Sequence, residues 1–201
     1  MSHEPTRFSL LVRLRDPQDG EAWERFVRIY LPPVFRMAKR YGLNEADAAD
    51  AAQDVLTAVH QRIGTFVYDP AKGSFRGWLK TVARSRICDL LDTRRRQPNG
   101  TGGSEANLRL EALPAAEEDD PWERDYRQGL FDAALEQLRR EVEPPTLKAF
   151  VRCAIEAAKP ADVAREMELS VGAVYIAKSR VTARIREIIA DWEREEQDHG
   201  C

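Results

Sequence analysis

The spacing of apolar residues along the chain predicts an all-α protein. Apolar positions recur at intervals of three and four residues, and the alternation typical of half-buried strands is absent. Pro32 and Pro33 predict a break in the second helix, because proline removes a backbone donor and clashes with the preceding turn. In the first half of the chain the pattern predicts helices over 9–15, 20–41, 45–63 and 74–95.

The helical period is interrupted and then resumes in the second half. The segment QPNGTGGSEAN (97–107) is rich in Gly, Asn and Pro, and the acidic run LPAAEEDDPWERD follows it. We therefore expect two small helical domains, over 1–97 and 126–201, joined by a flexible acidic linker over 98–125. In the second domain the pattern predicts helices over 126–141, 145–158, 160–167 and 171–196.

Charge is strongly segregated along the chain. The net charge of −3 argues against a uniformly basic nucleic-acid binder. However, residues 75–96 contain seven Lys/Arg and two Asp/Glu, a balance of +5, whereas residues 104–125 contain eight acidic residues and two arginines, a balance of −6. The local balance is therefore the better guide to binding surfaces.

Several functional classes find no support in the sequence. No stretch approaches the roughly 20 apolar residues of a membrane span, and the amino terminus lacks the core of a signal peptide, so we expect a cytoplasmic protein without membrane insertion. Cys88, Cys153 and Cys201 are scattered without CxxC spacing or histidine companions. With no phosphate loop or nucleophile motif either, we expect no metal, no cofactor and no enzyme activity.

The predicted helix over 74–95 carries a basic stripe. Arg76, Lys80 and Arg84 follow one another at four-residue intervals, away from an apolar face, and can follow a phosphate backbone. No carboxylate lies four residues before any of them, so ion pairs within the helix do not explain the stripe. A solvated helix surface is the alternative, and Trp78 fits a buried position as well as a base-stacking one.

The predicted helix over 45–63 carries an acidic ridge formed by Asp47, Asp50 and Asp54. The helix dipole accounts for acidic residues in the first turn but not for Asp54. A single helix supplies too few converging oxygens for a metal site. We favour a surface that contacts another protein.

Residues 159–189 have the pattern of a helix-turn-helix motif. Ser170 is placed to cap the second helix. The amino-terminal part of such a helix enters the major groove, where Ala173, Tyr175, Lys178 and Ser179 would meet base edges. Phosphate contacts would come from Arg180 and Arg184. An ordinary helical hairpin with a charged exterior is the alternative.

Three segments together resemble the sigma-70 family of RNA polymerase sigma factors. DAADAAQDVL (47–56) resembles region 2.2, YDPAKGSFRGWLKTVARSRICDLLDTRRR (68–96) resembles regions 2.3 and 2.4, and residues 130–189 resemble region 4. The short sequence between these regions is similar to the extracytoplasmic-function (ECF) group. In place of polar residues frequent in the family, the second helix of the motif carries Ile176 and Ala177.

The resemblance implies a role for each surface in promoter-specific initiation with core RNA polymerase. Region 2.2 would bind the β′ clamp helices, regions 2.3 and 2.4 would capture the −10 strand of promoter DNA, and region 4 would read the −35 element and rest on the β flap. The implied core-binding residues are Asp47, Asp50, Gln53 and Asp54. The implied −10 residues are Arg76, Trp78, Lys80 and Arg84. The implied −35 residues are Ser170, Gly172, Ala173, Tyr175, Lys178, Ser179, Arg180 and Arg184.

Two other classes of protein stay open at the level of sequence. One is a stand-alone helix-turn-helix regulator, which needs no basic strand-capturing helix. The other is a DNA-processing enzyme such as a recombinase, which needs a catalytic constellation that the sequence does not show. Regulation of a sigma factor of this length is expected to come from outside, through its expression or through a partner such as an anti-sigma factor.

Overall fold

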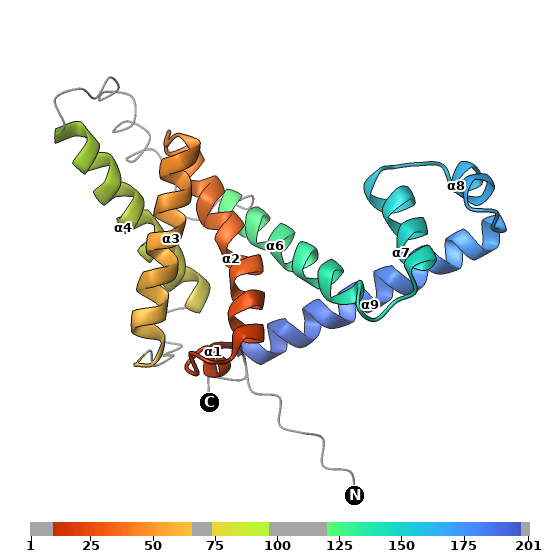
Figure 1. Cartoon of the computed structure of the whole chain (residues 1–201), viewed down its shortest axis with the longest axis horizontal. Helices are drawn as coiled ribbons and strands as arrows, with labels where there is room; N and C mark the ends of the chain where they lie inside the picture. The colour runs from red at the N-terminus through yellow and green to blue at the C-terminus, as the bar shows by residue number, and fades with distance from the viewer. Residues whose placement is uncertain (1–9, 66–73, 97–119, 198–201) are drawn as a thin grey trace, which may run out of the picture. The chain divides into compact units, whose positions relative to one another are not determined.

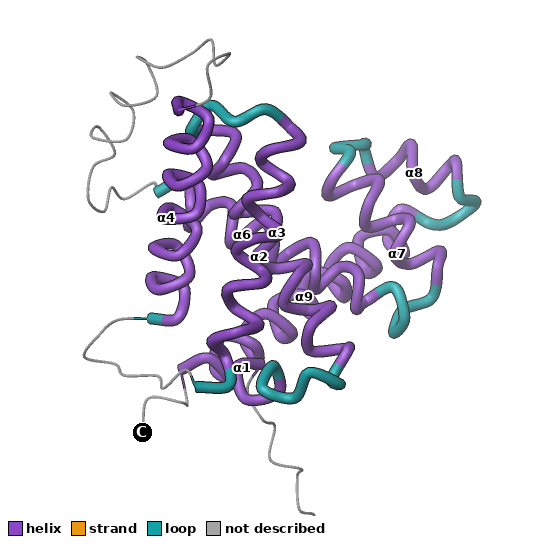
Figure 2. Tube along the Cα trace, turned by 60° about the vertical axis from the view of Figure 1, so that its left-hand side comes forward, coloured by secondary structure: helices purple, strands orange, loops and turns teal. Residues whose placement is uncertain are grey.

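The computed structural model describes residues 10–65, 74–96 and 120–197. Every regular element within these ranges is helical, as predicted (Figures 1 and 2). Among these helices, none has the length and apolar character needed to cross a bilayer. The contacts divide the chain into two compact units, Met1–Gly129 with Glu195–Cys201, and Leu130–Arg194.

The boundary between the units falls inside helices α6 (Pro121–Leu138) and α9 (Val171–Gln197) rather than in the acidic segment. Most of the predicted linker lies outside the described residues, but its end, residues 121–125, is helical. Asp120 precedes this helix and its side chain accepts a hydrogen bond from the backbone N–H of Trp122 at 3.0 Å. The predicted helix start at residue 126 is therefore wrong, because Asp120 at the end of the acidic segment caps a helix that begins five residues earlier.

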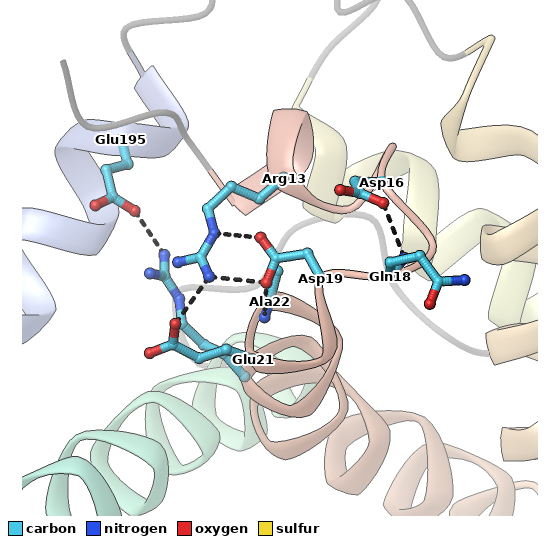
Figure 3. A network of polar contacts seen from close by, with 8 residues as sticks. Arg13, Asp16, Gln18, Asp19, Glu21, Ala22 and Glu195 are labelled. Atoms are coloured by element: carbon cyan, nitrogen blue, oxygen red, sulfur yellow. Dashed lines mark hydrogen bonds and ion pairs between the residues drawn. The ribbon is translucent and has the colours of Figure 1, made fainter.

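A turn stabilised by ion pairs joins α1 (Leu10–Arg13) to α2 (Gly20–Arg40). The Arg13 guanidinium donates to Asp19 at 2.8 and 2.9 Å and to Glu21 at 3.0 Å (Figure 3). Asp19 also caps α2 by accepting from the Ala22 N–H at 3.0 Å. The hydrogen bond from Arg13, and after it the one from the Ala22 N–H, holds the pKa of Asp19 below its usual range.

Helix α2 continues through Pro32 and Pro33 without interruption, so the predicted break is wrong. The helix is held on both sides of the prolines by its buried face, and that packing outweighs the local cost of proline. Buried residues on this face are Phe26, Ile29, Tyr30, Pro33, Val34 and Met37.

Helices α3 (Glu45–Ile63) and α4 (Phe75–Arg96) pack with α2 to form the core of the first unit. Asn44 caps α3 by accepting from the backbone N–H of Asp47 at 3.0 Å. An aromatic cluster lies between α2 and α4, where the ring centroids of Tyr30 and Phe75 are 5.7 Å apart in an edge-to-face arrangement.

The first half of α6 packs against this same cluster. Trp122 and Tyr126 are buried, and the Tyr126 ring lies 5.4 Å from that of Tyr30. One helical turn later, a Cβ on Gly129 would be 2.3 Å from the carbonyl oxygen of Ile29. Only glycine permits this approach of α6 to the α2 backbone.

The second unit is built from the rest of α6, α7 (Pro144–Phe150), a π-helical turn η2 (Val151–Ile155), α8 (Pro160–Glu166) and most of α9. The helix predicted over 145–158 therefore ends earlier and changes to π geometry in its second half. Small residues dominate a core cluster of this unit, which consists of Ala149, Cys153, Val163, Ala164, Val174 and Ala177.

We expect Gly129→Ala to lower the free energy of unfolding by about 1–3 kcal/mol, because the new methyl group overlaps backbone atoms that no rotamer change can move. Gly77→Ala is the matched control. Its Cβ meets only the Ser74 Oγ at 3.5 Å, and alanine favours a helix interior over glycine by about 1 kcal/mol. Chemical denaturation followed by circular dichroism measures both, and equal stability of Gly129→Ala and wild type would contradict the close approach.

Candidate nucleic-acid and polymerase interfaces

Helices α8 and α9 form the predicted helix-turn-helix. The Ser170 Oγ accepts from the backbone N–H of Ala173 at 3.1 Å, so this serine is the cap that its position predicted. In the turn, the Leu169 N–H donates to the Ala164 carbonyl at 2.9 Å. Val163 of α8 and Val174 of α9 are both buried and hold the two helices together.

The outer face at the start of α9 is exposed. Tyr175 and Ile176 are each 57% exposed, which is unusual for large apolar side chains and leaves both available to a partner. Ala177 is instead buried in the core of the unit, so its small size serves packing. Four other predicted −35 residues are also exposed on this face, namely Gly172, Lys178, Ser179 and Arg180. Ala173 is half-buried.

Arg184, like the capping Ser170, is engaged within the unit. Its guanidinium donates to Glu141 at 3.0 Å and to Glu187 at 3.2 Å. A hydrogen bond from Gln137, followed by the one from Arg184, keeps the pKa of Glu141 below its usual range. A phosphate contact by Arg184 requires exchange of these carboxylates.

Two members of the basic stripe of α4 are also engaged, and their partners lie at the start of α6 and directly before it. Arg76 pairs with Glu123 at 3.2 Å and lies 4.7 Å above the Tyr126 ring, and Lys80 pairs with Asp120. Arg84 is exposed. The spacing of residues along α4 does not predict these pairs, because Asp120 lies 40 residues from Lys80 in the sequence.

Trp78 is half-buried, and its ring centroid lies 5.3 Å from that of Phe75. It therefore contributes to the aromatic cluster between α2 and α4. Its packing role is established by this contact, whereas stacking on an unpaired base stays a prediction.

The acidic ridge of α3 divides into buried and exposed members. Asp50, Gln53 and Asp54 are exposed, but Asp47 is only 8% exposed and its carboxylate accepts a hydrogen bond from Arg94 of α4. Asp47 thus ties α3 to α4, and the structure does not place it on the surface with the other three. In the described part of the chain, no three His, Cys, Asp or Glu side chains are grouped as a metal site.

Comparisons with known proteins agree with this arrangement. Residues 26–97 match the family description Sigma-70 region 2, which covers α3, α4 and most of α2. The chain is 26% identical over 195 residues to the ECF RNA polymerase sigma factor SigE of Mycolicibacterium smegmatis, covering 94% of this chain and 70% of the relative. It is 31% identical over 90 residues to the ECF RNA polymerase sigma factor RpoE of Cereibacter sphaeroides, covering 45% of this chain and 48% of that protein.

The chain thus contains a sigma-70 region 2 and is similar over most of its length to an ECF RNA polymerase sigma factor. Sigma factors are non-catalytic initiation factors that act with RNA polymerase in promoter-specific transcription. The region 2 match favours this function over a stand-alone regulator or a recombinase. In this sigma factor, region 2 corresponds to the α2–α4 core of the first unit.

We expect Ser170→Ala to lower the stability of this sigma factor by about 1 kcal/mol, because the Ala173 N–H loses its acceptor. Ser170→Asp should retain most of the stability, since aspartate is an equally good cap. Ser179→Ala, on the same helix but beyond the cap, is the matched control and should cause no loss. Thermal unfolding measures all three, and an equal effect of the two alanine variants would contradict the capping role.

Proposed function

We propose that this sigma factor binds core RNA polymerase and directs initiation by recognising −10 and −35 promoter elements. The observation that carries the proposal is the capped and exposed start of α9, where the helix that would enter the major groove presents Tyr175, Lys178, Ser179 and Arg180. A buried or fully paired surface at this position would have argued for an ordinary hairpin.

For the −35 element, we propose that Tyr175 and Ser179 meet base edges and Arg180 holds a phosphate. Ser170 contributes through its cap, and Arg184 contributes after exchange from its carboxylate partners. The exposed Ile176 adds an apolar surface suited to thymine methyl groups. The remaining proposed contacts come from Gly172, Ala173 and Lys178.

For the polymerase, we propose that Asp50, Gln53 and Asp54 contact the β′ clamp helices. Their exposure on one helix supports this role. Asp47 would act indirectly, by holding α3 in place through Arg94.

We propose that the β flap binds in a groove of about 410 Å³ in the second unit. Its apolar lining includes Val142, Leu147 and Val151, and basic residues such as Lys148 surround it. An anti-sigma factor is a further proposed partner, and it would compete for these polymerase-binding surfaces.

For the −10 element, we propose that Arg76, Lys80 and Arg84 hold the phosphates of the captured strand while Trp78 stacks on a base. The positions of these side chains on a single helix after the core-binding helix support the proposal. The domains proposed for the two elements are residues 1–97 and 126–201, and the end of the segment between them packs against the first through Trp122.

Reconstitution with core polymerase tests the proposed function. We expect the combination of Asp50→Lys and Asp54→Lys to weaken core binding by about 100-fold, because it removes favourable charge pairs and introduces repulsion. Asp89→Lys combined with Asp92→Lys, the same charge change at two exposed positions of α4, is the control and should retain core binding. Wild-type protein that neither binds core nor initiates at any promoter of its own genome would overturn the proposal.

Reconstituted holoenzyme on a randomised −35 library separates base reading from phosphate binding. We expect Tyr175→Ala to change the selected sequence, with discrimination at one position reduced by about 1–3 kcal/mol. Arg180→Ala should weaken binding to all sequences and flatten the dependence of log K on log salt by about 0.9. Identical selection and salt profiles for the two variants would contradict this division of roles.

A further inference from the structure

Four basic side chains of the first unit converge on the acidic start of α6. Lys80 and Arg76 of α4 pair with Asp120 and Glu123. From α2, Arg40 and Arg36 approach the two oxygens of Asp125 at 2.6 and 3.4 Å. Three carboxylates that follow one another along a single segment thus engage cations from two different helices.

Fold stability alone does not account for this row of ion pairs. The burial of Trp122 and Tyr126 and the fit of Gly129 against α2 already hold α6 in place. In the pairs of Arg76 with Glu123 and of Lys80 with Asp120, the cations are 33% and 41% exposed, and ion pairs at such positions contribute little net stability because water screens them.

Two of the carboxylates occupy cations that a bound nucleic-acid strand would need. Asp120 and Glu123 pair with Lys80 and Arg76, to which the proposed function assigns −10 phosphates. These two cations cannot make the same contacts with α6 and with a phosphate at once. A bound strand must therefore exchange with Asp120 and Glu123.

The exchange extends to α2, because Asp125 continues the same acidic row. Asp125 is only 9% exposed, and a carboxylate so buried requires a charged partner, which Arg36 and Arg40 supply. Burial raises the pKa of Asp120, but the hydrogen bonds from Lys80 and the Trp122 N–H, with the charges of Lys80 and Arg40, hold it below its usual range, so cations of α2 and α4 act on this one carboxylate.

We propose that Arg36, Arg40, Arg76 and Lys80 form one phosphate-binding face for the promoter strand, and that Asp120, Glu123 and Asp125 cover this face in the free protein. The inference rests on the proposed −10 function and adds two arginines of α2 to it. It also gives the acidic start of α6 a role as an internal competitor, which promoter DNA displaces.

The competition is tested with a fluorescent single-stranded oligonucleotide carrying the −10 element of a promoter that the reconstituted holoenzyme uses. We expect the free triple variant Asp120→Asn, Glu123→Gln, Asp125→Asn to bind it about tenfold or more tightly than wild type. Its log K should also depend more steeply on log salt, by about 0.7 for each phosphate newly bound. Thermal unfolding checks that the variant is folded.

A matched variant controls for net charge. Glu45→Gln, Asp162→Asn and Glu193→Gln remove the same three charges at exposed positions away from α6. An affinity gain equal to that of the first triple variant would overturn the competition. Glu123→Gln alone supplies an independent measurement, because Glu123 is the most exposed of the three carboxylates; it should produce a smaller gain in the same direction.

The two arginines of α2 are tested in the triple-variant background, where no buried carboxylate is left without a partner. We expect Arg36→Ala and Arg40→Ala each to weaken oligonucleotide binding several-fold and to reduce the salt dependence. Lys39→Ala, an equal charge change at an exposed neighbour, is the control. Equal effects of Arg36→Ala, Arg40→Ala and Lys39→Ala would overturn the extended face.

Promoter-directed transcription by the reconstituted holoenzyme distinguishes this inference from the proposed function. Protein that initiates at its promoter, but whose α6 variants bind the oligonucleotide as wild type does, retains the proposed function and loses the competition. Holoenzyme that fails to initiate at any promoter removes the proposed function itself.

Discussion

The buried face of α2 is the constraint on which the first unit depends. It packs against α3 and α4, and its aromatic side chains reach the start of α6, where Tyr30 meets Tyr126. The contact at Gly129 fixes how closely α6 approaches α2. Because apolar burial and shape fit set this position, the polar residues that α6 carries are brought to a defined surface whatever their own contribution to stability.

In our proposal, that surface would couple the binding of a promoter strand to the acidic start of α6. The cations that a sigma factor would use for a DNA strand are already paired with carboxylates of its own chain. Such pairs add little stability in partly exposed positions, yet they compete fully with an incoming anion. The net charge of −3 is thus compatible with the proposed DNA binding, since part of the negative charge lies on carboxylates that a bound strand would displace.

The second unit uses polar contacts differently. Ser170 is committed to its cap and Arg184 to two carboxylates, whereas Tyr175, Ile176 and Arg180 at the start of α9 are exposed. The motif therefore separates residues that build the turn from residues that face outward. Its core relies on alanine, valine and cysteine side chains, which let short helices pack closely.

The sequence by itself determined the helical class, the extent of α3 and the cap at Ser170, because periodicity and capping are local properties. It also indicated the family through contiguous motifs. Only the tertiary structure decided that Asp47 is buried against Arg94, that α2 continues through its prolines, and that α6 begins at Pro121. These outcomes depend on packing between segments far apart in the chain. The ion pairs of Arg76 and Lys80 were likewise visible only in the tertiary structure, since pairs between residues far apart in the chain leave no periodic signal in the sequence.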